Sequence, residues 1–215
     1  MVSHELKTPL TTIMGITELV LAVSKQNNDV FASSALKRVV VQAKKMTGMI
    51  NGFLNISRLE SGKIVIAKEL FDINGLIEET VDESKLTAAD YQINFVPGPV
   101  IVVNADRDKI ASVLSNLLNN AVKYSHGGKN IEIRTQILQD ALQVSVQDNG
   151  IGIKTQHLDR IFERYYRVDG HYINSVSGFG IGLYLSAEIV LQHSGSIWAT
   201  SESGKGSTFY FTLAI

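Results

Sequence analysis

The sequence predicts an α+β protein in which a helical hairpin precedes an α/β sandwich, a mixed β-sheet with helices on one face. Residues 3–60 hold one proline and show no strand-like alternation, whereas helical and alternating segments mix from about residue 70 onward. The composition is that of a globular protein, with 45% apolar and 19% charged residues. At 215 residues the chain is long enough for two domains, which we expect at residues 1–62 and 68–215.

Apolar residues at helical spacing predict both helices of the hairpin. The heptad series of the second helix is Leu36, Val39, Ala43, Met46, Ile50, Phe53 and Ser57. The series of the first helix is Leu6, Pro9, Ile13, Ile16, Val20 and Val23. The polar residues 24–29 fit a connecting loop, and Gly62 fits the end of the second helix. Since two helices cannot enclose a core, we expect a homodimer whose two hairpins form a four-helix bundle.

The remaining elements follow from periodicity and turn residues. Helical spacing covers residues 73–89, 106–124 and 181–192, with a short helical piece near 158–163. Strands are expected at 93–96 and 100–103, around the Pro97-Gly98-Pro99 turn, and at 197–200 and 208–213. Alternation in 131–137 and 142–146 predicts a hairpin that turns at Gln139-Asp140.

Composition excludes several classes of site and partner. The net charge of −1 gives no electrostatic reason to expect nucleic acid or an anionic membrane as a partner. The chain has no cysteine, which removes disulfides, thiol catalysis and thiolate metal sites. No run of about 18 apolar residues occurs, so we expect no membrane segment in this chain.

His4 is a candidate nucleophile on the first helix. It begins a stripe opposite the apolar series, which continues with Thr8, Thr11, Gly15 and Glu18. A neutral imidazole nitrogen is a good nucleophile at pH 7, and the adjacent Glu5 can accept a proton or orient the ring. A surface histidine near a helix end is the alternative interpretation.

Asn116, Asn120 and Lys123 form a polar stripe on the helix expected at 106–124. Two amide oxygens one turn apart can bind a hard cation such as Mg²⁺, and the lysine can then meet a phosphate. Asparagine is a mediocre helix former, so its clustering here favours a functional reason. A solvated helix face remains the alternative.

Two glycine-containing segments complete the candidate site. Asp148 ends an alternating strand, where its carboxylate can accept a hydrogen bond from an exocyclic amine such as that of adenine. Gly150 and Gly152 after it permit positive φ and close approach to a ligand, although a plain turn is the alternative. The run G-F-G-I-G at 178–182 opens a helix, whose N-terminus can bind an anion, but alone it is a weak signal.

The order of five motifs carries more information than any one of them. They are SHELKTPL at 3–10, NLLNNAVKYS at 116–125, DNGIGI at 148–153, FERYYRVD at 162–169 and GFGIGL at 178–183. In this order the whole chain resembles the sensor histidine kinases of two-component signalling. The resemblance implies a dimerisation and histidine-phosphotransfer domain, followed by a Bergerat-type ATP-binding domain like those of gyrase and some chaperones.

The resemblance implies catalytic roles for four residues. His4 matches the phosphorylated histidine, and Glu5 matches the acid that assists proton removal. Thr8 matches the residue that positions water for phosphatase action on the partner. Arg167 matches the arginine near the γ-phosphate.

The resemblance also implies the nucleotide contacts. Asn116 and Asn120 match the residues beside Mg²⁺, and Lys123 and Tyr124 match nucleotide contacts. Asp148 matches the aspartate that reads adenine. The matching glycines are Gly150 and Gly152, which shape the pocket, and Gly178, Gly180 and Gly182, at the phosphate end of a mobile lid. Phe179 departs from the family, which often has Thr or Ser there, so a phosphate-binding hydroxyl is missing.

The activity so implied is autophosphorylation of His4 from ATP–Mg²⁺ and transfer of the phosphoryl group to an aspartate of a response regulator receiver domain, with phosphatase activity in addition. The expected partners are a second copy of the chain and that regulator, and the expected location is cytoplasmic, with an anchor, if any, in a preceding part of a longer protein. The alternative is an ATP-gated interaction module of the same fold, which shares Asp148 and the glycines but performs no phosphotransfer.

Overall fold

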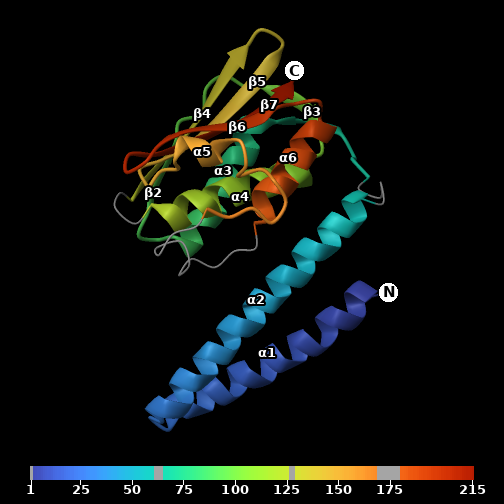
Figure 1. Cartoon of the computed structure of the whole chain (residues 1–215). Helices are drawn as coiled ribbons and strands as arrows, with labels where there is room; N and C mark the ends of the chain where they lie inside the picture. The colour runs from blue at the N-terminus through green and yellow to red at the C-terminus, as the bar shows by residue number, and fades with distance from the viewer. Residues whose placement is uncertain (1, 61–64, 126–128, 169–179) are drawn as a thin grey trace. The chain divides into compact units, whose positions relative to one another are not determined.

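The structure is a computed structural model that describes residues 2–60, 65–125, 129–168 and 180–215. Side chains are described at these residues except at positions 2–9, 44, 45, 51 and 55–60. The chain divides into two compact units, residues 1–64 and the described residues from Val65 onward. We call them the hairpin unit and the sheet unit. Figure 1 shows the helices of the first and the sheet of the second.

The hairpin unit consists of helices α1 (Val2–Gln26) and α2 (Val30–Glu60), which pack against each other. The connecting loop is shorter than expected, because α1 continues through residue 26. Asn28 takes a positive φ of 54° in this loop. The Asp29 carboxylate caps α2 by accepting a hydrogen bond from the Ala32 N–H at 2.9 Å.

The predicted heptad series divides between two surfaces of the hairpin unit. In α2, Ala43 is buried and Leu36 and Ile50 are half-buried, whereas Val39, Met46 and Phe53 are exposed. Among the described side chains of α1, Leu10, Thr17 and Ser24 are buried, whereas Ile13, Ile16, Val20 and Val23 are exposed. The part of the predicted first-helix series from Ile13 to Val23 is therefore not the face that meets α2. A hairpin with this sequence leaves an apolar surface without a partner among the described residues.

The sheet unit is built on a five-stranded mixed sheet with strand order β2-β4-β5-β7-β6. Its strands are β2 (Gln92–Phe95), β4 (Asn130–Leu138), β5 (Ala141–Asp148), β6 (Ile197–Glu202) and β7 (Gly206–Ala214). The β2–β4 pair is parallel and the other pairs are antiparallel. The predicted β4–β5 hairpin is present, and Gln139 takes a φ of 54° at its turn.

Helices cover one face of this sheet, as Figure 1 shows, which confirms the predicted sandwich. They are α3 (Ile73–Thr87), α4 (Arg107–Tyr124) and α6 (Gly182–Gln192). The apolar face of α4, with Ile110, Leu114 and Leu117 fully buried, packs in one core with Val144 and Val146 of β5. The core therefore fixes the position of α4 relative to the end of β5.

A buried histidine joins the start of α4 to the end of α6. His193 Nε2 accepts a hydrogen bond from the Asp106 N–H at 2.9 Å, and Nδ1 bonds the Ile189 carbonyl at 2.7 Å. The Asp106 carboxylate caps α4 through the Lys109 N–H and also accepts from the Ala67 N–H at 3.0 Å. Burial raises the pKa of Asp106, but the hydrogen bonds from these two backbone N–H groups, together with the charges of Lys109 and His193, outweigh burial, so the pKa is lowered overall.

The structure departs from the sequence-based expectations in two places. The strands expected on either side of residues 97–99 are present, but β2 joins the large sheet while β3 (Val102–Ala105) pairs with β1 (Glu69–Asp72), a strand that was not predicted. The short helix α5 (Thr155–Leu158) also comes earlier than the one expected near 158–163.

The other face of the sheet carries polar and aromatic side chains. Trp198 of β6 stacks on Tyr210 of β7, with ring centroids 5.2 Å apart and an interplanar angle of 9°.

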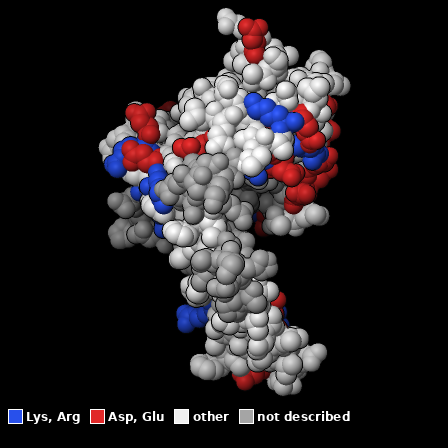
Figure 2. Space-filling view, turned by 90° about the vertical axis from the view of Figure 1, so that its right-hand side faces the viewer, with Lys and Arg blue, Asp and Glu red and all other residues white. Residues whose placement is uncertain are grey.

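On the face of the molecule drawn in Figure 2, acidic and basic side chains are interspersed. Among the described residues, no helix is long and apolar enough to cross a membrane.

Candidate nucleotide site

Asp148 is a buried carboxylate at the last position of β5, and only 4% of it is exposed. Burial raises the pKa of Asp148, while hydrogen bonds from the Gly150 and Ser207 backbone N–H groups and the nearby Ser125 hydroxyl oppose the rise. The Gly150 N–H lies 2.8 Å from Oδ1. Ser125 is itself fully buried, and among the described residues its hydroxyl has no well-aligned hydrogen-bond partner. Such a carboxylate is suited to accept a hydrogen bond from a buried ligand amine.

The turn after Asp148 fits tightly between α4 and the β6–β7 hairpin. A Cβ at Gly150 would overlap the Tyr124 carbonyl oxygen, and a Cβ at Gly152, where φ is +65°, would overlap the Glu202 carbonyl. The Ile151 N–H donates to the Tyr124 carbonyl at 3.1 Å. Both glycines are therefore required by the backbone itself.

Asn116 lies between α4 and α6. Its Nδ2 donates a hydrogen bond to Ser186 Oγ at 2.9 Å, and its Oδ1 lies where a Cβ on Gly182 would stand. No hydrogen bond from a described residue occupies this oxygen. Asn120 is half-buried one turn further along the same helix. These amide oxygens are of the type that Mg²⁺ accepts, so the residues present fit the ion.

Lys123 is the basic end of the polar stripe that Asn116 and Asn120 begin. Tyr124 and Arg167 lie near it. Burial, together with the charge of Arg167, lowers the pKa of Lys123. Burial raises the pKa of Tyr124, while Arg167 opposes the rise. Lys123 Nζ also lies 5.0 Å from the centroid of the Tyr124 ring. Arg167 thus lies close enough to α4 to influence both side chains, as a site for a polyanion requires.

Gly180 is hydrogen-bonded to the segment that contains Arg167. The Tyr165 N–H donates to the Gly180 carbonyl at 2.8 Å, and both residues have positive φ. A Cβ at Gly180 would come within 2.5 Å of the Tyr166 carbonyl oxygen. Gly178 and Phe179 lie outside the described residues. The side chains of His4, Glu5 and Thr8 also lie outside them, although their backbone is part of α1.

Sequence reasoning missed four residues of this region. Ser186 and Ser207 contact site residues from distant parts of the chain, and no local pattern marks them. Ser125 stands at the end of the asparagine-containing motif, which was a usable signal. Gly206, with φ of +109°, lies against the Asp148 carbonyl, and its sequence context indicated only a turn.

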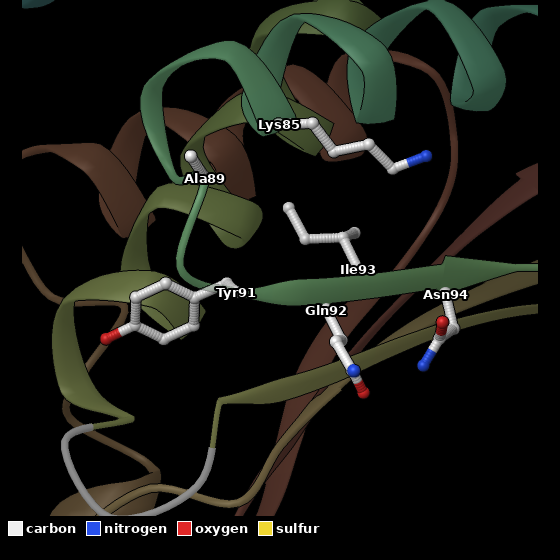
Figure 3. Close-up of a pocket in the computed structure, with 6 residues that line it drawn as sticks. All are labelled: Lys85, Ala89, Tyr91, Gln92, Ile93 and Asn94. Atoms are coloured by element: carbon white, nitrogen blue, oxygen red, sulfur yellow. The ribbon is translucent and has the colours of Figure 1, made fainter.

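A separate open hollow of about 650 Å³ lies along the edge strand β2 and is lined by Lys85, Ala89, Tyr91, Gln92, Ile93 and Asn94. Figure 3 shows these side chains around the space between the end of α3 and β2. None of the predicted site residues lines it, so it is distinct from the candidate nucleotide site.

Comparison with known proteins identifies both parts of the chain. Residues 105–215 match the family model "Histidine kinase-, DNA gyrase B-, and HSP90-like ATPase", and residues 1–62 match "His Kinase A (phospho-acceptor) domain". The sensor protein kinase WalK of Staphylococcus haemolyticus is 35% identical in an alignment that covers 99% of this chain and 35% of that protein. The chain thus spans about a third of that relative's length.

Solved structures share the fold. Full-length ShkA in complex with AMPPNP matches with a TM-score of 0.76 at 24% identity, over 99% of this chain and 44% of that chain. The catalytic domain of the histidine kinase ThkA matches with a TM-score of 0.58 at 26% identity, over 69% of this chain and 95% of that chain. Because the ATPase model covers more than half of the sequence and a phospho-acceptor model covers residues 1–62, the chain belongs to the histidine kinase-, DNA gyrase B- and HSP90-like ATPases, as the catalytic core of a sensor histidine kinase.

Proposed function

We propose that this chain phosphorylates its own His4 from ATP–Mg²⁺ and passes the phosphoryl group to an aspartate of a response regulator. The observation that carries the proposal is the buried Asp148 carboxylate, which shares the sheet unit with the stripe formed by Asn116, Asn120 and Lys123. Membership of the family supports it, since residues 1–62 match a phospho-acceptor model. We place the two domains at residues 1–62 and 68–215.

The nucleotide is bound by residues of the sheet unit. The exocyclic amine of adenine donates to the Asp148 carboxylate, and Gly150 and Gly152 keep the pocket open for the base. Lys123 and Arg167 neutralise phosphate charge, with Tyr124 beside them. Gly180 and Gly182 allow the backbone at the start of α6 to approach the phosphates.

Asn116 and Asn120 hold Mg²⁺ through their side-chain oxygens. When bound, Mg²⁺ neutralises charge on the phosphate oxygens during transfer. Gly178 belongs to the same glycine segment by its match to the family motif.

The phosphoryl transfer is an in-line displacement. An imidazole nitrogen of His4 attacks the γ-phosphorus, an N–P bond forms, and the bond from phosphorus to the β,γ-bridging oxygen breaks to release ADP. Glu5 accepts the imidazole proton. The regulator's aspartate then takes the phosphoryl group from the histidine. In the phosphatase reaction, Thr8 positions a water that attacks the phosphorus of the aspartyl phosphate, which releases inorganic phosphate and the free aspartate. Two copies of the chain assemble through the hairpin units.

A labelling experiment tests this function. ATP labelled in its γ-phosphate should transfer an acid-labile, alkali-stable label to the wild-type chain. The His4→Gln variant should lose the label completely and keep its ATP affinity, because His4 belongs to the hairpin unit and the nucleotide is bound by the sheet unit. Calorimetry with ATP is the control. ATP binding by the wild-type chain without any label would instead support the interaction module that performs no phosphotransfer.

A further inference from the structure

Ser186 is a buried polar side chain on the inner face of α6. Only 2% of it is exposed, and its buried neighbours on the helix are Ile189 and Val190. A hydroxyl in such a position costs free energy unless it forms a hydrogen bond. Ser186 Oγ has this bond, because it accepts from Asn116 Nδ2 at 2.9 Å.

Gly182 lies one helical turn before Ser186, so the two residues share a face of α6. A Cβ at Gly182 would overlap Asn116 Oδ1. The Asn116 amide therefore lies across this face, with its nitrogen against Ser186 and its oxygen against Gly182 at the start of the helix. One end of the amide is held by a hydrogen bond, and no described residue hydrogen-bonds the oxygen at the other end, which has the chemistry to bind a cation.

We propose that Ser186 is a positioning residue for Mg²⁺, which holds the Asn116 amide so that Oδ1 faces the ion. This inference rests on the proposed function, in which Asn116 is a Mg²⁺ ligand. The orientation matters because the two ends of an amide differ chemically: the oxygen can coordinate a hard cation, whereas the NH₂ group presents hydrogens to it. A fixed orientation removes the cost of ordering this side chain when the ion binds.

The proposal separates metal binding from nucleotide binding. Ser186 contacts Asn116, and the residues assigned to adenine are Asp148 and the glycines after it. Loss of the Ser186 hydroxyl should therefore weaken the contribution of Mg²⁺ and leave the metal-free affinity for the nucleotide unchanged. A purely structural role in packing α4 against α6 would lower the melting temperature and both affinities together.

The test is calorimetry of ADP binding to the full chain, in Mg²⁺ and in EDTA. In Ser186→Ala the enhancement of ADP affinity by Mg²⁺ should fall by roughly 3- to 10-fold, the size expected for one buried hydrogen bond. The affinity in EDTA should stay the same. Ser186→Cys, which keeps a weaker acceptor of similar shape, should give an intermediate enhancement.

Ser112→Ala is the matched control, because Ser112 lies on α4 and its hydroxyl donates a hydrogen bond to the Asp108 carbonyl in the same helix. This variant should show the wild-type enhancement. An unchanged enhancement in Ser186→Ala, or an equal loss with and without Mg²⁺, would overturn the proposal. If Mg²⁺ did not change the ADP affinity of the wild-type chain, the proposal would also be overturned. Failure of the proposed kinase function alone would appear as absent labelling together with a normal effect of Mg²⁺ on ADP affinity.

Discussion

The sheet unit and the hairpin unit differ in how far each completes its own core. In the sheet unit the apolar residues of α4 and β5 are almost entirely removed from water. In the hairpin unit, among the described side chains, Leu10 and Ala43 are the buried apolar ones, and a larger set stays exposed. Apolar periodicity alone therefore does not tell whether a helix packs inside one chain. The sheet unit has what it needs to fold alone, and the hairpin unit needs a further apolar surface.

The largest effect should come from a charge placed on that exposed surface. Met46→Glu should convert a dimer into monomers, because Met46 belongs to the exposed half of the heptad series, which a second hairpin would bury. Light scattering and analytical ultracentrifugation measure the change.

Val41→Glu is the control for Met46→Glu. The two side chains are exposed to nearly the same degree in one hairpin, 51% for Val41 and 52% for Met46, but Val41 lies outside the heptad series. Val41→Glu should leave the dimer intact. Equal effects of the two substitutions would mean that the heptad series is not the dimer interface.

A smaller but clear effect should come from Asp148→Asn in the sheet unit. The variant keeps the shape of the side chain but turns a donor toward the adenine amine, which should weaken ATP binding about 10- to 100-fold. Calorimetry measures this loss. Unaltered ATP binding would remove Asp148 from the base-reading role.

Although Asp148→Asn should weaken ATP binding, it should not lower the thermal stability of the nucleotide-free chain. Burial raises the pKa of Asp148 above its ordinary value of 3.8, so the folded state favours the protonated acid. That contribution to stability is complete below pH 3.8 and is lost as the pH rises through the raised pKa. At pH 7 the nucleotide-free Asp148→Asn chain should therefore melt at the same or a higher temperature than the wild type, and the difference should vanish at acidic pH.

The smallest effects are expected on the free energy of unfolding when one helix cap in each unit is removed. Asp106→Ala removes the acceptor for both the Lys109 and Ala67 N–H groups in a buried position and should cost about 2 kcal/mol of unfolding free energy. Asp29→Ala removes an exposed cap of α2 and should cost about 0.5–1 kcal/mol. Chemical denaturation measures both costs. A larger cost at Asp29 would contradict the view that the sheet unit is the more tightly packed region.

The sequence predicted those parts of the fold whose signals are local. The β4–β5 hairpin and the helix α4 follow from alternation and helical spacing within a few residues. Strand β1 was missed because four residues give little periodicity, and its partner β3 lies about thirty residues later. The pairing of β2 with β4 was not visible for the same reason, since strand partners are chosen by packing across the sheet.

The candidate site likewise has residues that local sequence signals predicted and contacts that they did not. Asn116, Asn120 and Lys123 share one helix, so their common stripe could be predicted from spacing. The contact of Asn116 with Ser186 spans 70 positions, and only the packing of α6 on α4 reveals it. The proximity of Arg167 to Lys123 and Tyr124 likewise depends on the path of the chain after α5.

The stacked pair of Trp198 and Tyr210 gives the molecule a built-in optical reporter. The chain has one tryptophan, and it belongs to the sheet unit, so tryptophan emission monitors that unit alone. Circular dichroism in the far ultraviolet, in contrast, monitors the long helices α1 and α2 as well. If the two signals change at different denaturant concentrations, the units unfold as separate cooperative blocks, and their stabilities can be measured in one sample without a label.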